Sequence, residues 1–298
     1  MLVLLNGRYL KGTIVVVDRE KYLYAMEGRI MSEIEEVLSG GNVNKVVRVG
    51  ETIRRSATNN SYVNDLLLHL EKSGFCNAPR FLGKDEQGRE MFTFIPGEVP
   101  GNDYPDISPY MWSDTSLIEI AKLQRKFHDA TLGFTSEAIP KHAYPDPAIN
   151  EVVCHNDAAP YNFVFKDQYP MALIDFDMAS PGPRIWDIAY TLYTTVPLAS
   201  FEPAAAVAAT VSYSPDLHAG NRRRRIALFF ENYGMEAPDN LKQWVIERLQ
   251  TLCATLSQGA ANGEEAFVKM IEEGHLSHYE QEIKFLTLNF DDWTIYQD

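Results

Sequence analysis

The chain is poor in cysteine, in long apolar runs and in positive charge, and each shortage excludes a class of protein. Its three cysteines, Cys76, Cys154 and Cys253, are odd in number and widely spaced. Neither a disulfide framework nor a zinc knuckle fits that spacing, so we expect a reducing, cytoplasmic environment. No stretch approaches the roughly 18 consecutive apolar residues of a membrane span. Met1–Leu5 lack the basic start of a secretory signal, and we therefore expect no membrane partner.

Acidic residues outnumber basic ones, 41 to 27, and the formal net charge is -14. Such a chain repels nucleic acid and anionic lipid unless a local basic patch overrides the field, so no nucleic-acid partner is expected. Two explanations of the excess stay open here: it keeps the protein in solution, or it lines a cleft for a cationic substrate. With 298 residues, 45% of them apolar, the chain can bury one large core or two moderate ones.

The first third of the sequence is typical of a small β-sheet domain. Asn6-Gly7, flanked by apolar residues, indicates a hairpin. Apolar spacing predicts a short helix over 28–38 and a helix beside the sheet over 64–72. Strands are predicted at 46–49, 52–55, 80–82 and 91–95. Because Pro96-Gly97 breaks this pattern, we expect an N-terminal β-rich, nucleotide-binding domain over residues 1–96.

The remainder is mostly helical. Amphipathic spacing predicts helices at 117–130, 240–256 and 264–273. The stretch 151–177 differs, because short strands are predicted there at 151–154, 163–165 and 171–174. We therefore expect an α+β protein whose larger, helical C-terminal domain covers residues 97–298.

One constellation in this second domain carries chemistry. His155, Asp157 and Asn162 have the spacing H-x-D-x-x-x-x-N, and Asp175 follows in Ile174-Asp175-Phe176-Asp177. Each piece alone is weak evidence. In this order, and each next to an expected strand, they resemble the catalytic core of the eukaryotic-like kinases.

Phosphoryl transfer explains these residue types, because it needs the triphosphate charge neutralised and the acceptor hydroxyl aligned. Mg2+ prefers hard oxygen ligands, so Asp175 and Asn162 are predicted to hold the metal. Asp157 is predicted to accept the proton of the acceptor hydroxyl or to aim it. His155 is expected to pack beneath the loop and to hold its shape.

The motif departs from the protein-kinase pattern at two positions, and these departures indicate a different kinase family. Asp177 replaces the glycine of D-F-G, and Ala159 stands where many protein kinases carry lysine. The pattern is similar to the aminoglycoside phosphotransferase family, which includes choline-kinase-like enzymes, and Trp186-Asp187-Ile188-Ala189 matches its D-x-A element. The resemblance covers roughly residues 35–290.

This resemblance implies a two-lobed protein-kinase-like fold, with a small β-sheet lobe that carries one helix and a larger helical lobe. It implies that Asp187 braces the catalytic loop. The implied activity is ATP- and Mg2+-dependent phosphorylation of a hydroxyl on a small molecule, such as an aminoglycoside, an amino alcohol or a sugar. The acceptor pocket is then expected among the helices of residues 190–298.

The nucleotide-binding half matches the family less clearly. Gly40, Gly41 and Asn42 stand where the family has its phosphate-covering loop, with an ordinary hairpin turn as the alternative. Strand alternation points only one residue of Arg54-Arg55 inward, and we predict that Arg54 faces the phosphates. Adenine is expected beside the connecting stretch that contains Phe94.

The glutamate that would pair with this arginine is missing from its expected place, where Val63 stands. That departure leaves open a second reading, a non-catalytic kinase-like binding protein or a toxin-immunity protein. Elsewhere, Arg222–Arg225 is expected to be a solvated helix face, with an anchor for an anionic group as the alternative. His128 is expected to be structural or on the surface.

Overall fold

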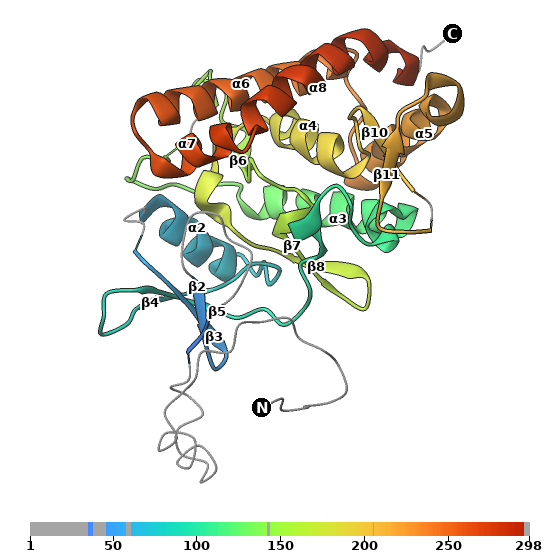
Figure 1. Ribbon diagram of the computed structural model, residues 1–298. Helices are drawn as coiled ribbons and strands as arrows, with labels where there is room; N and C mark the ends of the chain where they lie inside the picture. The colour runs from blue at the N-terminus through green and yellow to red at the C-terminus, as the bar shows by residue number, and fades with distance from the viewer. Residues whose placement is uncertain (1–34, 38–45, 58–60, 142–143, 205, 295–298) are drawn as a thin grey trace, which may run out of the picture. The chain divides into compact units, whose positions relative to one another are not determined.

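The computed structural model describes residues 35–37, 46–57, 61–141, 144–204 and 206–294. Contacts divide the chain into two compact units, one of residues 1–57 and 82–94 and the other of residues 58–81 and 95–298. The first unit is built on a sheet and the second is mostly helical (Figure 1). The expected α+β class, with an N-terminal sheet and a helical C-terminal part, is confirmed.

The sheet of the first unit has the strand order β1-β2-β3-β5-β4. The pairs β1-β2, β2-β3 and β3-β5 are antiparallel. Its strands are β1 (Glu35–Val37), β2 (Val46–Val49), β3 (Thr52–Arg55), β4 (Phe81–Lys84) and β5 (Glu90–Thr93). A tight turn joins β2 to β3, and Gly50 supplies its positive φ of 59°. Thr52 Oγ1 closes this turn by donating to the Val49 carbonyl at 2.8 Å.

The helix predicted over 28–38 is wrong at its C-terminal end. Glu35–Val37 form strand β1, in which Val37 lies opposite Val47 of β2. All three residues are exposed, so backbone pairing at the sheet edge decides their conformation and side-chain burial does not. The rest of that segment and the hairpin at Asn6-Gly7 lie outside the described residues.

The second unit contains seven described helices: α2 (Ser61–Lys72), α3 (Asp114–Ala130), α4 (Arg184–Thr195), α5 (Pro215–Tyr233), α6 (Leu241–Ala261), α7 (Glu265–Glu272) and α8 (His275–Asn289). Helix α3 packs on α5, and α6 packs on α4, α7 and α8. Figure 1 shows α6 and α8 side by side in orange and red. Of these helices, α4 and α8 were not predicted from the sequence, and α5 was expected only as the helix face at residues 222–225. Across the described residues, no helix has the length and apolarity that crossing a bilayer requires.

Helix α3 illustrates why these segments fold as they do. The Ser113 side chain caps its first turn by accepting a hydrogen bond from Ser116 N at 3.1 Å. One face of the helix is buried and includes Leu117, Ile120 and Phe127. Two polar side chains, Gln124 and His128, lie on this same buried face, and both are completely buried.

Short strands and single turns of 3-10 helix connect the helices. The strand pairs are β6 (Val152–Cys154) with β9 (Ser180–Gly182), β7 (Phe163–Lys166) with β8 (Tyr169–Leu173), and β10 (Phe201–Pro203) with β11 (Thr210–Ser212). The single turns are η1 (Pro100–Asp103), η2 (Pro109–Trp112), η3 (Pro160–Asn162), η4 (Phe176–Met178) and η5 (Phe290–Trp293).

The expectation of a solvated face at Arg222–Arg225 is wrong for two of the four arginines. Arg222 and Arg225, three residues apart on α5, are 0% and 4% exposed. Arg222 donates to the Ala199 carbonyl at 2.8 Å and pairs with Glu202 at 3.1 Å. Its guanidinium also lies 4.1 Å from the centre of the Tyr213 ring. A desolvated guanidinium is tolerated here because carbonyl, carboxylate and ring acceptors surround it.

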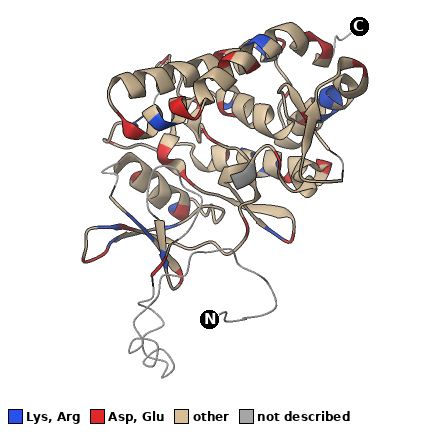
Figure 2. Ribbon diagram, in the orientation of Figure 1, with Lys and Arg blue, Asp and Glu red and all other residues tan. Residues whose placement is uncertain are grey.

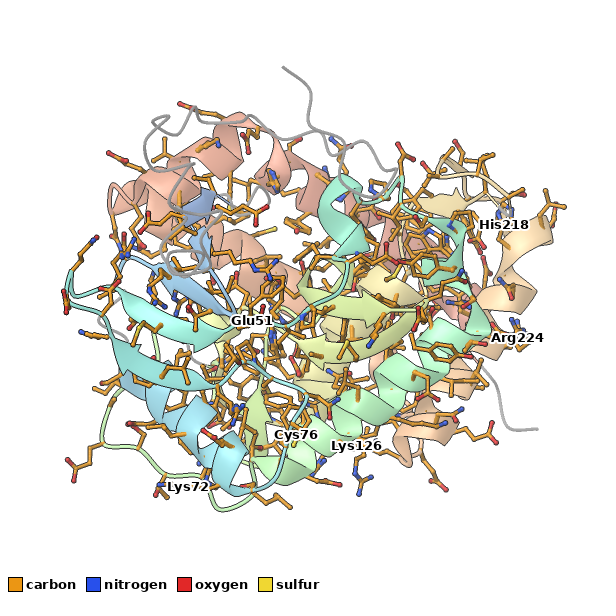
Figure 3. All side chains as sticks on the ribbon, turned by 90° about the horizontal axis from the view of Figure 1, so that it is seen from below. Glu51, Lys72, Cys76, Lys126, His218 and Arg224 are labelled. Atoms are coloured by element: carbon orange, nitrogen blue, oxygen red, sulfur yellow. The ribbon has the colours of Figure 1, made fainter. Side chains whose placement is uncertain are left out.

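Arg225 and its exposed neighbour Arg224 both bind Asp114, at the start of α3, at 2.9 and 2.6 Å. Arg225 also donates to the Thr195 carbonyl, at the end of α4. Figure 3 labels Arg224 beside α5. Figure 2 shows acidic and basic residues spread along the described parts of the ribbon. The arginine run therefore links α5 to α3 and α4 within the second unit.

Candidate active site

Two strand pairs of the second unit bring the motif residues together. Strand β6 leads into the loop that carries Asp157, and η3 then leads into β7. Phe163 of β7 pairs with Leu173 of β8, and Ile174 N donates to the Asn162 carbonyl at 3.0 Å. The predicted metal ligands Asn162 and Asp175 are therefore brought to neighbouring positions, although they are far apart in the sequence.

Asp157 is half-buried, and both of its carboxylate oxygens accept hydrogen bonds. Tyr161 donates to Oδ1 at 2.9 Å, and Asn162 Nδ2 donates to Oδ2 at 2.8 Å. Burial and the nearby charge of Asp175 raise the pKa of Asp157 to about 7, against the lowering effect of these two donors and of Arg248. A carboxyl group with this pKa can exchange a proton near neutral pH, as general acid-base catalysis requires.

The two predicted metal ligands fit a hard cation. Asn162 bonds Asp157 through its amide nitrogen, and its oxygen Oδ1, the atom that can bind a cation, lies on the other branch of the amide. Asp175 is exposed and adopts a left-handed conformation with φ 63° and ψ 70°. One carboxylate and one amide oxygen match the few protein ligands that Mg2+ takes when phosphates complete its shell.

His155 is completely buried beneath the loop that carries Asp157. Its Nε2 lies 3.0 Å from the Ile174 carbonyl, and its Nδ1 accepts from Asp157 N at 3.3 Å. Burial lowers the pKa of His155, so the ring is neutral with its proton on Nε2. The Phe176 ring packs against it at 4.7 Å between centroids. His155 thus links the loop that carries Asp157 to the strand end that precedes Asp175, as its predicted structural role requires.

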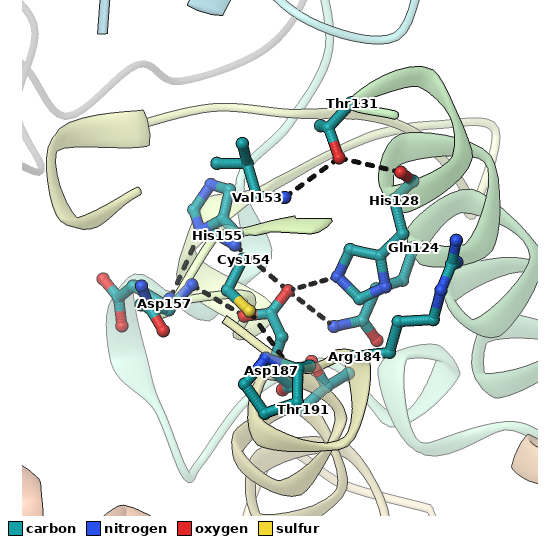
Figure 4. A network of polar contacts seen from close by, with 12 residues as sticks. Gln124, His128, Thr131, Val153, Cys154, His155, Asp157, Arg184, Asp187 and Thr191 are labelled. Atoms are coloured by element: carbon teal, nitrogen blue, oxygen red, sulfur yellow. Dashed lines mark hydrogen bonds and ion pairs between the residues drawn. The ribbon is translucent and has the colours of Figure 1, made fainter. Parts of the chain in front are cut away.

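Asp187 lies at the centre of a buried network below this loop (Figure 4). Its Oδ2 accepts from Gln124 Nε2, His128 Nε2 and His155 N at 3.0, 2.9 and 3.1 Å. Its Oδ1 accepts from Asn156 N at 2.6 Å. Burial acts to raise the pKa of Asp187, but the hydrogen bonds and charges of its partners, His128 first, hold it well below the usual range. The network supports the expected bracing of the loop.

Asn156, the residue before Asp157, is held in a left-handed conformation with φ 64°. Its side chain donates to the Met178 carbonyl at 2.9 Å and to Ser180 Oγ at 2.8 Å. Its own carbonyl accepts from Arg248 Nη2 of α6. Non-glycine residues persist in this conformation when surrounding contacts over-determine it, and these contacts set the direction in which Asp157 leaves the loop.

Four of these supporting residues were not predicted from the sequence: Gln124, Asn156, Tyr161 and Arg248. A signal existed for the first, because Gln124 and His128 stand four apart on the predicted apolar face of the helix at 117–130. A polar pair on such a face requires a buried partner. No comparable signal marks Arg248, which lies on α6 with its guanidinium 4.8 Å from the centre of the Tyr190 ring.

The predicted nucleotide-binding residues lie in the first unit. Arg54 lies 3.5 Å from the Asp85 carboxylate and donates to Thr52 at 2.7 Å. Arg55 pairs with Glu90, directly opposite on β5, at 3.2 Å. The roles of Arg54 and of Phe94 toward the nucleotide stay predictions.

The Phe94 ring lies 3.9 Å from the guanidinium of Arg48. Gly40, Gly41 and Asn42 lie outside the described residues. Val63, at the position where the family's glutamate was expected, is 2% exposed on α2 and belongs to the core.

Part of the chain is similar in sequence to known proteins. Residues 103–229 match the model of the phosphotransferase enzyme family. A curated relative, the trifolitoxin immunity protein of Rhizobium leguminosarum bv. trifolii, is 34% identical over 154 residues. That alignment covers 49% of this chain, and it spans 56% of the relative's length.

Solved structures share the fold over most of both chains. A choline kinase from Cryptosporidium parvum Iowa II superposes with a TM-score of 0.54 at 13% identity, over 93% of this chain and 99% of the kinase. The GDP and kanamycin complex of APH(2")-IIia gives 0.52 at 14% identity, over 91% and 98%. The protein-kinase-like fold is therefore confirmed, and so is the resemblance to the aminoglycoside phosphotransferase and choline-kinase-like family.

Proposed function

We propose that this chain is a small-molecule kinase that transfers the γ-phosphoryl group of ATP, with Mg2+, to a hydroxyl of its acceptor. The observation that carries the proposal is the Asp157 carboxylate, held by Tyr161 and Asn162 on a loop next to Asp175. Phosphoryl transfer needs little covalent chemistry from the protein, so positioning and charge are the main requirements. The match of residues 103–229 to a phosphotransferase family supports the same activity.

In this proposed reaction each residue of the site has one role. Asp157 accepts the proton of the acceptor hydroxyl, and the pKa of about 7 suits that task near neutral pH. Asn162 and Asp175 hold Mg2+, which neutralises phosphate charge when it is bound. His155 and Asp187 keep the loop in shape from below. The acceptor pocket lies among the helices of residues 190–298, and the net charge of -14 suits a cationic acceptor.

The test is an assay of ADP and GDP release with Mg2+, because one related structure contains GDP. The acceptor panel includes kanamycin, choline and neutral sugars. Asp157→Asn and Asp175→Asn form the matched pair of variants. We expect acceptor-dependent release by the wild type, loss of turnover with retained nucleotide binding in Asp157→Asn, and loss of Mg2+-dependent nucleotide binding in Asp175→Asn. A wild-type protein whose melting temperature does not respond to Mg2+ with either nucleotide contradicts the proposal.

The second candidate, a non-catalytic immunity protein, is favoured by the name of the relative that is 34% identical. Its test is expression in a trifolitoxin-sensitive strain, with the wild type beside Asp157→Asn. Equal protection by both proteins supports a binding role without phosphoryl transfer. Protection by the wild type alone assigns the immunity to the catalytic activity.

A further inference from the structure

A series of three tyrosine hydroxyls leads away from the Asp157 carboxylate. Tyr161 Oη lies 2.9 Å from Asp157 Oδ1 and 2.8 Å from Tyr190 Oη, and Tyr190 Oη lies 3.5 Å from Tyr279 Oη. The three side chains come from η3, α4 and α8. Position 161 is one of the five unspecified positions of H-x-D-x-x-x-x-N, so the kinase motif itself does not call for tyrosine.

The direction of these hydrogen bonds follows from the chemistry of the groups. An ionised carboxylate only accepts, so Tyr161 donates to Asp157. The Tyr161 oxygen then accepts from Tyr190, and the Tyr190 oxygen accepts from Tyr279. Burial raises the pKa of Tyr161 and of Tyr190, so both stay protonated donors. Aligned hydrogen bonds polarise one another, and each hydroxyl in this series therefore strengthens the next bond toward Asp157.

The backbone of Tyr161 is held as closely as its hydroxyl. Gly101 of η1 packs directly on this turn, since a Cβ atom there would overlap Tyr161 N and the Pro160 carbonyl carbon. Only glycine permits this approach. Tyr161 is thus fixed at its backbone by η1 and at its hydroxyl by Tyr190, which is 2% exposed.

We propose that Tyr161 is a positioning residue for phosphoryl transfer at Asp157, and that Tyr190 acts through it; this inference rests on the function proposed above. With Tyr161 on Oδ1 and Asn162 on Oδ2, the carboxylate is held against rotation about its χ2 bond. The lone pairs of Asp157 that these two bonds leave free then point in one fixed direction, toward the acceptor hydroxyl. A reacting group displaced by about 1 Å can lower the rate roughly a hundredfold, so a lost positioning bond has a measurable effect.

The test compares Tyr161→Phe, Tyr190→Phe and the double variant with the wild type. The reactions are transfer to the acceptor found in the panel and slow hydrolysis of Mg-ATP, in which water is the acceptor. We expect Tyr161→Phe to lower kcat about tenfold, with the KM for ATP within about twofold of the wild-type value. Tyr190→Phe should have a smaller effect. The double variant should be no slower than Tyr161→Phe, because Tyr190 acts only through Tyr161.

Tyr193→Phe is the matched control. Tyr193 lies one turn further along α4 and is 3% exposed, but its hydroxyl lies 3.3 Å from His278 Nε2 instead of reaching the catalytic loop. We expect wild-type kcat from this variant. Melting temperatures without nucleotide give a readout independent of activity. Tyr161→Phe should lower the melting temperature by a few degrees in the wild-type background and by less in an Asp157→Ala background.

The outcomes separate the two proposals. An active wild type with unchanged kcat in Tyr161→Phe overturns the positioning role and leaves the proposed kinase activity intact. Additive losses in the double variant, or an equal loss in Tyr193→Phe, also overturn it, because they indicate general damage to α4. A wild type that neither binds Mg-ATP nor turns it over contradicts the kinase activity, and the positioning role fails with it.

Discussion

Two carboxylates, Asp157 on the loop and Asp187 beneath it, have pKa values that are shifted in opposite directions. Asp187 is completely buried, yet four donors hold its pKa below the usual range. Asp157 is more exposed, yet burial and the charge of Asp175 raise its pKa to about 7. Burial alone therefore does not set the charge of a carboxyl group here, and the surrounding donors and charges decide it. Asp187 accepts hydrogen bonds from the loop backbone, and in the function proposed above Asp157 exchanges a proton.

The largest expected effect comes from Asp187→Ala. This change leaves His128, Gln124 and the backbone of His155 and Asn156 without their buried acceptor. Removal of one partner from such a network costs roughly 3–5 kcal/mol. Urea unfolding should show that loss of stability together with lost activity. An exposed acid of α3, Glu119, pairs with Lys122 on the surface and supplies the control, so Glu119→Ala should unfold like the wild type.

Asp157→Asn should separate activity from stability. The amide keeps the shape of the side chain and removes the group that accepts the acceptor's proton. Turnover should fall by roughly two to four orders of magnitude, while the urea midpoint stays at or above the wild-type value, because the folded protein disfavours the charged carboxylate. A large drop in the midpoint would show that Asp157 is structural, as Asp187 is.

Gly101→Ala tests the contact that holds the loop from the side of η1. The new methyl group would overlap the Pro160–Tyr161 backbone, and relief of such a clash typically costs about 1–3 kcal/mol. We expect a lower melting temperature and a lower kcat, since Tyr161 must shift. Gly220 of α5 is the matched control, because a Cβ atom there meets nothing within 4 Å. If Gly101→Ala and Gly220→Ala behave alike, the close packing of η1 on the loop is incorrect.

The last test is the pH dependence of stability without nucleotide or metal. A lowered pKa makes ionised Asp187 stabilising above the ordinary carboxyl pKa near 4, and this contribution is lost as the pH falls below that value. A raised pKa gives Asp157 the opposite sign, so its contribution is present below about pH 4 and is lost as the pH rises toward 7. The stability of Asp157→Asn relative to the wild type should therefore increase between pH 4 and 7. A flat difference over that range contradicts the raised pKa.

The strands beside the motif, and the grouping of the motif residues between them, could be predicted from the sequence. The strands expected at 46–49 and 52–55 match β2 and β3 residue for residue. The H-x-D-x-x-x-x-N spacing placed His155, Asp157 and Asn162 on one loop, since a loop of this length between two strands keeps its members together. By contrast, the arginine run was misjudged, because the three-residue spacing of Arg222 and Arg225 shows only that they share a face of α5.

Sequence by itself determined the local chemistry of this protein: a carboxylate, an amide and a second carboxylate at fixed distances along the chain. Tertiary structure alone decided which distant groups surround them. Gln124 and His128 of α3 bind Asp187 beneath the loop. Arg248 of α6 and Tyr190 of α4 bind the loop itself, and all four are placed by the packing of their helices. Helical periodicity predicts which face of a helix is buried, but it does not predict which residues that face contacts. The pKa values of Asp157 and Asp187 depend on those contacts, so only the folded chain decides which carboxyl group has a raised pKa and which has a lowered one.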